Sequence, residues 1–127
     1  MPMMSLTLPF LLIGLMARGV SASQIVDAKI ETKLAPSPVE YAVLLPDGYE
    51  SAKDPLPLLL FLHGGGGDKS FLTRMRPVFD EMWKAGTLPP MVVATPSAGR
   101  SFYMDYKDGS QKWETFIATR HFLFSSA

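Results

Sequence analysis

The residues with the clearest chemical potential form the run His63-Gly64-Gly65-Gly66-Gly67, directly after the apolar stretch Leu56 to Leu62. Consecutive glycines let a chain turn tightly and let several backbone N–H groups point into one hollow. Two chemistries use such a hollow: binding of a phosphate group, and stabilisation of the oxyanion that forms when an ester carbonyl is attacked. The residues around the run discriminate between these two chemistries.

The spacing around the glycines argues against a phosphate site. A P-loop needs a glycine directly before Lys-Ser/Thr, and here Lys69-Ser70 follows Asp68 instead. A dinucleotide-binding fingerprint fits Gly64 and Gly66, but its third glycine would have to stand where Lys69 stands. Stabilisation of an oxyanion by backbone donors makes no such demand, so the run fits this chemistry better.

Gly64, Gly65 and Gly66 are therefore predicted to supply backbone N–H donors to an oxyanion, as the His-Gly-Gly-Gly loops of lipases and esterases do. His63 is predicted to support the loop through a hydrogen bond rather than to act as a catalytic base. The alternative is a plain turn between a strand and a helix. Four glycines cost backbone entropy without adding packing, which favours the functional interpretation.

The elements that would hold this loop follow from the hydrophobic pattern. Gln24 to Leu34 alternates apolar and polar residues and predicts an edge strand with one face in water. Val39 to Leu45 predicts a second strand, and the proline-rich link between the two predicts an antiparallel hairpin. Leu56 to Leu62 is apolar throughout, which predicts a strand that is buried on both faces.

A helix is predicted from Phe71 to Ala85, with Asp68 or Ser70 as its N-cap and Gly86 as its C-terminal stop. The face of this helix predicted to be buried carries Phe71, Met75, Val78, Phe79 and Met82. The apolar run Met91 to Thr95 then predicts another buried strand.

A second helix from Trp113 to about Ala118, with Ser110 as its cap, is the last predicted element. Strand, glycine-rich turn, helix and strand together predict a right-handed parallel crossover. The predicted fold class is α/β, with a mixed sheet that combines antiparallel N-terminal strands and a parallel β-α-β unit.

Four motifs resemble, in this order, the esterase D-like family of α/β-hydrolases: LLPDGY at 44–49, LPLLLFLHGGGG at 56–67, VVATPSAGRSFYMDY at 92–106 and KWETFI at 112–117. That family includes S-formylglutathione hydrolases, feruloyl esterases and mycolyltransferases, and the resemblance runs from about Val39 to Ile117. It implies eight main strands in the order 1-2-4-3-5-6-7-8. It also implies a serine nucleophile on a Gly-x-Ser-x-Gly turn after the fifth strand, followed by an acid and a histidine.

The catalytic triad implied by the resemblance finds no match among the 127 residues. The nearest approach to Gly-x-Ser-x-Gly is residues 19–23, which fail at the last position. The second histidine, His121, lies in a tail, residues 118–127, that does not resemble the family. The expectation is an N-terminal part of an α/β-hydrolase domain, residues 23–117, truncated before the nucleophile by a frameshift or premature stop and inactive by itself. The alternatives are a non-catalytic binding or interaction module and a non-functional gene fragment.

Residues 1–22 are predicted to be a signal peptide. Leu6 to Ala17 is an apolar run of twelve residues, which suits a signal peptide and is shorter than the about 20 residues that cross a membrane. Val20 and Ala22 are the small residues that a signal peptidase reads, with cleavage expected before Ser23. The protein is therefore expected to be exported, to the periplasm or outside the cell, with no stable membrane span.

Composition excludes several other classes of function. Lys plus Arg and Asp plus Glu number 12 each, so no basic surface for nucleic acid is expected. Cysteine is absent and the two histidines match no metal-ligand spacing, so no metal or cofactor is predicted. The expected partner, if the enzyme is completed, is a small-molecule or carbohydrate-linked ester. The strand Leu56 to Leu62 would keep an open edge, which predicts self-association that sedimentation would reveal.

The stretch between the last strand and the last helix is rich in turn residues and aromatic rings. Its carboxylates are predicted to be solvated loop charges rather than acid–base groups: Asp105, Asp108 and Glu114. Its aromatic residues could line an acyl pocket or pack in the core: Phe102, Tyr103, Tyr106 and Trp113.

Overall fold

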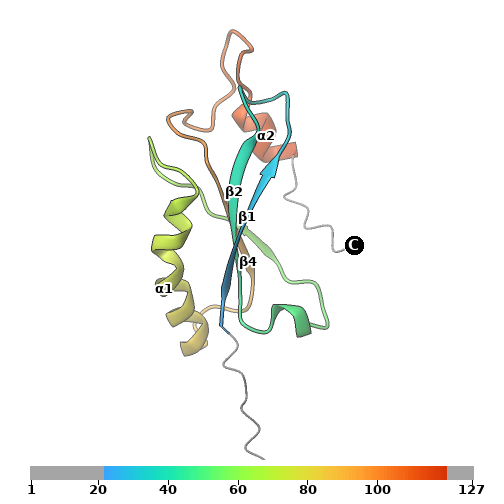
Figure 1. The fold of residues 1–127 in the computed structure, drawn as a ribbon, viewed down its shortest axis with the longest axis vertical. Coiled ribbons are helices and arrows are strands. Elements are labelled where there is room, and N and C mark those ends of the chain that lie inside the picture. The colour runs from blue at the N-terminus through green and yellow to red at the C-terminus, as the bar shows by residue number, and fades with distance from the viewer. Residues whose placement is uncertain (1–21, 120–127) are drawn as a thin grey trace, which may run out of the picture.

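The computed structural model describes residues 22–119. Its elements, in chain order, are β1 (Gln24–Ile30), β2 (Val39–Leu45), the 3-10 turn η1 (Tyr49–Ser51), β3 (Leu58–Leu60), α1 (Ser70–Ala85), β4 (Val92–Pro96) and α2 (Trp113–Thr119) (Figure 1). Every element predicted from the hydrophobic pattern is present, although β1 ends four residues earlier than predicted, because the chain turns away after Ile30.

The four strands form one sheet in the order β1-β2-β4-β3. β1 pairs with β2 and β2 with β4 in antiparallel fashion, whereas β3 and β4 are parallel. The β3–α1–β4 segment is therefore the predicted parallel crossover, and the antiparallel hairpin β1–β2 precedes it. The α/β class and the mixed sheet are confirmed, and the strand order agrees with the 1-2-4-3 that the family resemblance implies.

The two helices lie on opposite sides of the sheet, as Figure 1 shows. One core cluster joins the sheet to α1: Ala42, Leu44, Leu72, Phe79 and Val93. Another joins the sheet to α2: Ala35, Val39, Ala98, Trp113 and Phe116. Because side chains alternate between the two faces of a strand, β2 contributes to both clusters. Each fully buried leucine or phenylalanine contributes about 1.5–3 kcal/mol; Leu44 lies on β2, and Leu72 and Phe116 lie on the two helices that pack against the sheet.

The third strand differs from its prediction. Only Leu58–Leu60 pair as a strand, and the side chains of Leu58 and Leu59 are 43% and 38% exposed. Within residues 22–119, β3 pairs with β4 alone, so its second edge and part of its surface face water. The predicted burial on both faces is therefore wrong for the described structure. Self-association through this edge stays a prediction.

Helix α1 begins one residue earlier than predicted and ends as predicted. The N-cap position is occupied by Lys69, which makes no side-chain cap bond, so the prediction of Asp68 or Ser70 as the N-cap is wrong. The Asp68 carboxylate instead accepts the N–H of Ser70, the first residue of the helix, at 2.8 Å. Hydrogen bonding from the side chain and the backbone of Ser70 holds the pKa of Asp68 below its usual value. Gly86 ends the helix in a left-handed conformation, with φ of 72°, which glycine adopts without strain.

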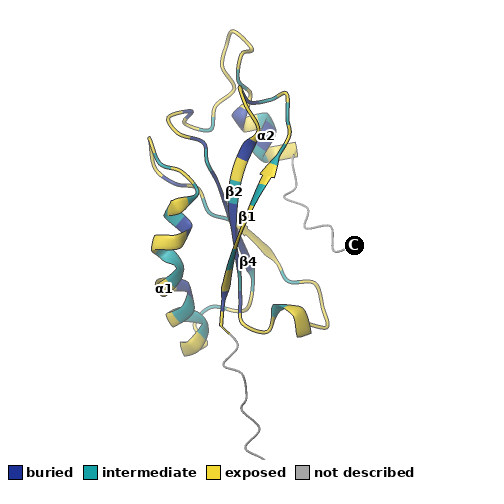
Figure 2. Cartoon of the chain, viewed as in Figure 1, coloured by how far each residue is buried: buried dark blue, intermediate teal, exposed yellow. Residues whose placement is uncertain are grey.

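The buried face of α1 is turned slightly from the predicted one. Leu72 is fully buried beside Phe79, whereas Val78 is 44% exposed. Figure 2 shows that α1 carries both buried and exposed residues along its length. The prediction was wrong at Val78, because the helix presents the Leu72 side to Leu44 and Val93 of the sheet. Pro77 lies inside the helix, which is continuous from Ser70 to Ala85.

Two carboxylates of the loop before α2 are exposed, as predicted, and accept hydrogen bonds that hold the loop. The Asp105 carboxylate accepts hydrogen bonds from the N–H and hydroxyl of Thr115, so Asp105, rather than the predicted Ser110, caps α2. Asp108 accepts from the N–H and hydroxyl of Ser110 in the same way. Both aspartates are exposed, and these bonds hold their pKa values below the usual range.

The predicted leader falls almost entirely outside the described residues, and so does the predicted tail from residue 120, including His121. Ser23, at the predicted cleavage point, is only 5% exposed and accepts hydrogen bonds from the guanidinium of Arg76 in α1. Cleavage and export stay predictions. Between residues 22 and 119, no helix is long and apolar enough to span a membrane.

Candidate oxyanion site

The glycine loop (residues 63–67) follows β3, and the segment of residues 97–106 follows β4. Because β3 and β4 are parallel neighbours, their carboxyl ends bring the two segments together, at the position where open α/β sheets bind ligands. A backbone bridge joins Gly67 to Gly99, and the Ser97 hydroxyl accepts the Lys69 N–H at 2.9 Å. In Figure 1 both segments extend from the same end of the sheet.

His63 connects the two segments. Its ring is 4% exposed, its Nδ1 lies 2.7 Å from the carbonyl oxygen of Gly64, and its Nε2 accepts the Ala98 N–H at 2.9 Å. Since Nε2 accepts, the neutral imidazole must carry its proton on Nδ1, which donates to Gly64. Both ring nitrogens are therefore engaged within the protein, and neither is free to take a proton from a nucleophile.

The N–H groups of Gly64 and Gly65 are held in fixed directions. A trans peptide is planar, so its N–H points opposite to its C=O. The His63 carbonyl, in the plane of the Gly64 N–H, accepts the Tyr103 hydroxyl at 2.8 Å. The Gly64 carbonyl, in the plane of the Gly65 N–H, accepts from His63 and also from the Gly67 N–H at 3.1 Å.

Gly64 and Gly65 are exposed, and their N–H groups donate to no other residue between 22 and 119. The Gly66 N–H, in contrast, donates to the Gly99 carbonyl at 3.0 Å. The inclusion of Gly66 among the donors is therefore corrected: the bridge between the two segments already uses its N–H. Two adjacent N–H groups therefore remain without an acceptor among residues 22–119 and are open to a ligand. Backbone donors of this kind stabilise an oxyanion when both aim at the position it occupies.

The Arg100 side chain lies beside the glycine loop. A Cβ added to Gly66 would stand 3.5 Å from its Nε, and Arg100 is exposed. Its permanent positive charge adds to the potential that favours an anion at the loop. Gly66 itself has φ of 78°, a backbone conformation that favours glycine.

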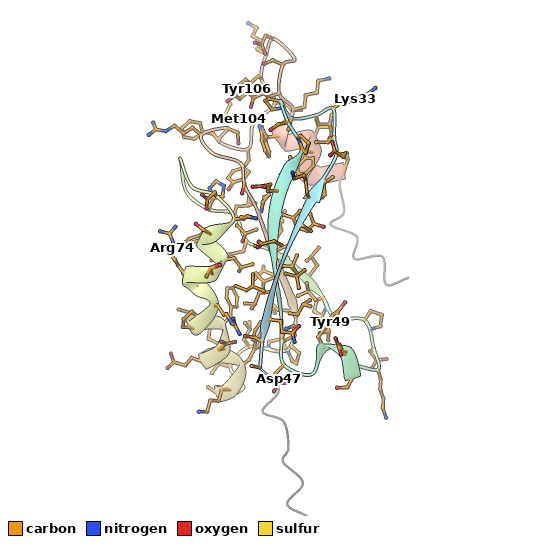
Figure 3. The ribbon with its side chains drawn as sticks, in the orientation of Figure 1. Lys33, Asp47, Tyr49, Arg74, Met104 and Tyr106 are labelled. Atoms are coloured by element: carbon orange, nitrogen blue, oxygen red, sulfur yellow. The ribbon has the colours of Figure 1, made fainter. Side chains whose placement is uncertain are left out.

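The aromatic residues between β4 and the start of α2 divide between the surface and the core. Phe102 is 71% exposed, and its ring would lie 3.8 Å from a Cβ at Gly65. Met104 and Tyr106 are also exposed, and Figure 3 labels them at this end of the molecule. Trp113 is buried against Phe116, so its role is packing. Of these side chains, the Phe102 ring is the one that adjoins the glycine loop.

Tyr103 is half-buried, with its ring centroid 5.6 Å from that of His63. Burial raises the pKa of its hydroxyl above the ordinary value of 10. The hydroxyl is therefore protonated at neutral pH and able to donate to the His63 carbonyl. Sequence reasoning considered Tyr103 only as a pocket or core residue, because no local pattern reveals a contact across forty positions.

The cavities of the described residues do not coincide with the glycine loop. Two cavities, of about 240 and 470 Å³, lie at the opposite end of the sheet and are lined in common by Ala22 and Pro46. Figure 3 labels Asp47 and Tyr49 at that end, far from Met104. No group of three or more potential metal ligands occurs between residues 22 and 119. Neither cavity includes a residue of the glycine loop.

Comparison with solved structures places this arrangement in a known fold. A ferulic acid esterase is 27% identical to this chain, with a TM-score of 0.68; the match covers 79% of this chain and 42% of the esterase. The chain carries part of an α/β-hydrolase fold. No protein-family model matches it, and no curated protein sequence matches it.

Two further α/β-hydrolases show the same likeness at the level of the fold. The ferulic acid esterase of the anaerobic fungus Anaeromyces mucronatus is 15% identical over 80% of this chain and 42% of its own, with a TM-score of 0.59. The S-formylglutathione hydrolase of Staphylococcus aureus is 16% identical over 84% of this chain and 44% of its own, with a TM-score of 0.57. The chain spans about two fifths of the length of these enzymes.

In α/β-hydrolases the loop between the third strand and the first helix supplies one side of the oxyanion hole. The glycine loop occupies this position, between β3 and α1. The place of the loop in the fold therefore agrees with the chemistry that its two free N–H groups allow.

Proposed function

We propose that this chain belongs to a serine carboxylic-ester hydrolase and provides the oxyanion-binding loop of that enzyme. The observation that carries the proposal is the pair of exposed N–H groups of Gly64 and Gly65, whose directions are fixed by bonds to the carbonyls of their own peptide planes. Their position at the carboxyl end of a parallel strand, in a fold shared with esterases, supports the same function.

The mechanism assigned to these residues is electrostatic. When a serine hydroxyl attacks an ester carbonyl, the carbonyl oxygen becomes an oxyanion, and donors already aimed at it stabilise the transition state without reorganisation. Gly64 and Gly65 donate from this chain, and Arg100 adds positive potential. His63 holds the loop in place and exchanges no proton, because both of its ring nitrogens are bonded within the protein.

The 127 residues alone are proposed not to hydrolyse esters. They contain no Gly-x-Ser-x-Gly sequence, His63 is engaged, and His121 lies in the tail that does not resemble the family. The nucleophile and the base are therefore proposed to come from a further polypeptide segment. The substrate class proposed is a small-molecule or carbohydrate-linked ester. The exposed Phe102 ring beside Gly65 would contact the apolar part of such a substrate.

A chimeric enzyme tests the proposal. Residues 22–119 replace the corresponding part of the 27%-identical ferulic acid esterase, which then contributes the nucleophile, acid and histidine. We expect this chimera to hydrolyse a p-nitrophenyl ester, because the donors of the glycine loop meet a complete triad. The assay compares kcat with that of the same chimera whose nucleophilic serine is alanine.

A second exchange covers the case in which the two halves pack poorly. Only residues 63–67 replace the corresponding loop of the esterase, which keeps the rest of its own fold. Activity in either protein supports the proposal. A cooperatively folded loop exchange that hydrolyses ester no faster than its serine-to-alanine control would contradict it.

A further inference from the structure

We infer that Tyr103 is a positioning residue that aims the Gly64 N–H at the oxyanion, acting through the His63 carbonyl. The inference rests on the proposed function of the glycine loop. The Tyr103 hydroxyl donates to the His63 carbonyl oxygen at 2.8 Å across forty positions of the sequence. No other hydrogen bond to that oxygen occurs between residues 22 and 119.

The peptide plane transmits this contact. The His63 carbonyl and the Gly64 N–H belong to one planar trans peptide, so fixing the oxygen fixes the direction of the N–H on the other side. The neighbouring plane is fixed independently, since the Gly64 carbonyl accepts from His63 and Gly67. Without the Tyr103 bond, the plane between His63 and Gly64 would lose its anchor at the oxygen, and glycine on its C-terminal side offers little resistance to rotation.

Tyr103 is itself held in an unusual conformation. Phe102 and Tyr103 both have φ of 55°, a left-handed conformation that non-glycine residues seldom adopt and that costs about 1–3 kcal/mol each. The Tyr103 N–H donates to the Ser101 hydroxyl at 3.1 Å, and its ring packs against the core cluster of Trp113 and Phe116. The strained turn therefore directs the ring inward and its hydroxyl toward His63, while Phe102 stays at the surface.

The first test uses the 127-residue chain itself. In Tyr103→Phe the ring and its packing remain and only the donor is removed. We expect the carbonyl ¹³C resonance of His63 and the amide resonance of Gly64 to shift. Tyr106→Phe is the matched control, because the Tyr106 hydroxyl makes no hydrogen bond in the described structure and should leave both resonances in place.

The second test measures catalysis in the chimera. Tyr103→Phe is expected to lower kcat about tenfold with KM unchanged, a fraction of the 10²–10³-fold loss that follows removal of an oxyanion donor. Tyr106→Phe is expected to keep kcat. A purely structural role would lower the melting temperature and leave kcat of the folded enzyme unchanged, and that result would overturn the inference.

The two tests separate this inference from the proposed function. If the unsubstituted chimera and the loop exchange are both inert while the His63 and Gly64 resonances still respond to Tyr103→Phe, the proposed ester chemistry fails and the contact stands. If the enzymes are active and Tyr103→Phe changes neither the resonances nor kcat, the positioning role is overturned.

Discussion

Replacing Gly67 with alanine is expected to destabilise the chain by about 1–3 kcal/mol, the range for overpacking a well-filled site. A Cβ at Gly67 would stand 2.9 Å from Nδ1 and 3.0 Å from Cγ of His63, and 3.1 Å from the Gly64 carbonyl oxygen. The imidazole has little room to move aside, because it is buried and bonded through both nitrogens. Urea unfolding of the 127-residue chain measures the change.

Gly64→Ala is the matched control for this substitution. It makes the same chemical change three residues earlier, where a Cβ would meet nothing within 4 Å, so a change within about 0.5 kcal/mol is expected. A double-mutant cycle adds a second control, since Gly67→Ala should cost less once His63 is alanine and only the contact with the Gly64 carbonyl oxygen remains. Equal effects of Gly67→Ala in the presence and absence of His63 would contradict the assigned contact.

Removing the Gly65 N–H is expected to lower kcat of the chimera by about 10²–10³-fold, the loss measured when one oxyanion donor is deleted. Gly65→Pro deletes this N–H, keeps the Gly64 carbonyl that accepts from His63, and follows a glycine, which tolerates a proline after it. KM should change little, because the donor acts mainly on charge that develops in the transition state.

Gly65→Ala is the control for the lost donor. It retains the N–H, its Cβ would lie 3.8 Å from the Phe102 ring, and that distance is ordinary van der Waals contact. Steady-state kinetics of both variants, with melting curves to verify folding, decide the outcome. If folded Gly65→Pro and Gly65→Ala have the same kcat, the Gly65 N–H does not bind the oxyanion.

Much of the fold could be predicted because each element carries a local signal. The apolar runs placed β2, α1 and β4 within about one residue, and Gly86 ended its helix where its tolerance of positive φ suggested. The glycine run indicated the candidate site, because four consecutive glycines cost backbone entropy and add no packing. These signals are properties of neighbouring residues, which a sequence displays directly.

The features that could not be predicted depend on contacts between distant segments. Leu58 looked buried from its apolar neighbours, yet its exposure is decided by which strand lies beside β3. Gly66 looked equivalent to Gly64 and Gly65, and only the Gly99 carbonyl distinguishes it. Asp105, rather than Ser110, accepts a backbone N–H in the first turn of α2, because the loop folds back and brings the Asp105 carboxylate to Thr115.

The central claim is tested most directly by a crystal structure of the chimera whose nucleophilic serine has been phosphonylated, since the phosphonyl oxygen occupies the position of the oxyanion. The distances from this oxygen to the backbone nitrogens of Gly64 and Gly65 are the measurement. We predict that at least one of them lies at about 2.7–3.1 Å, the range for an oxyanion-hole donor. An oxygen held by other groups and beyond hydrogen-bond reach of both nitrogens would contradict the account.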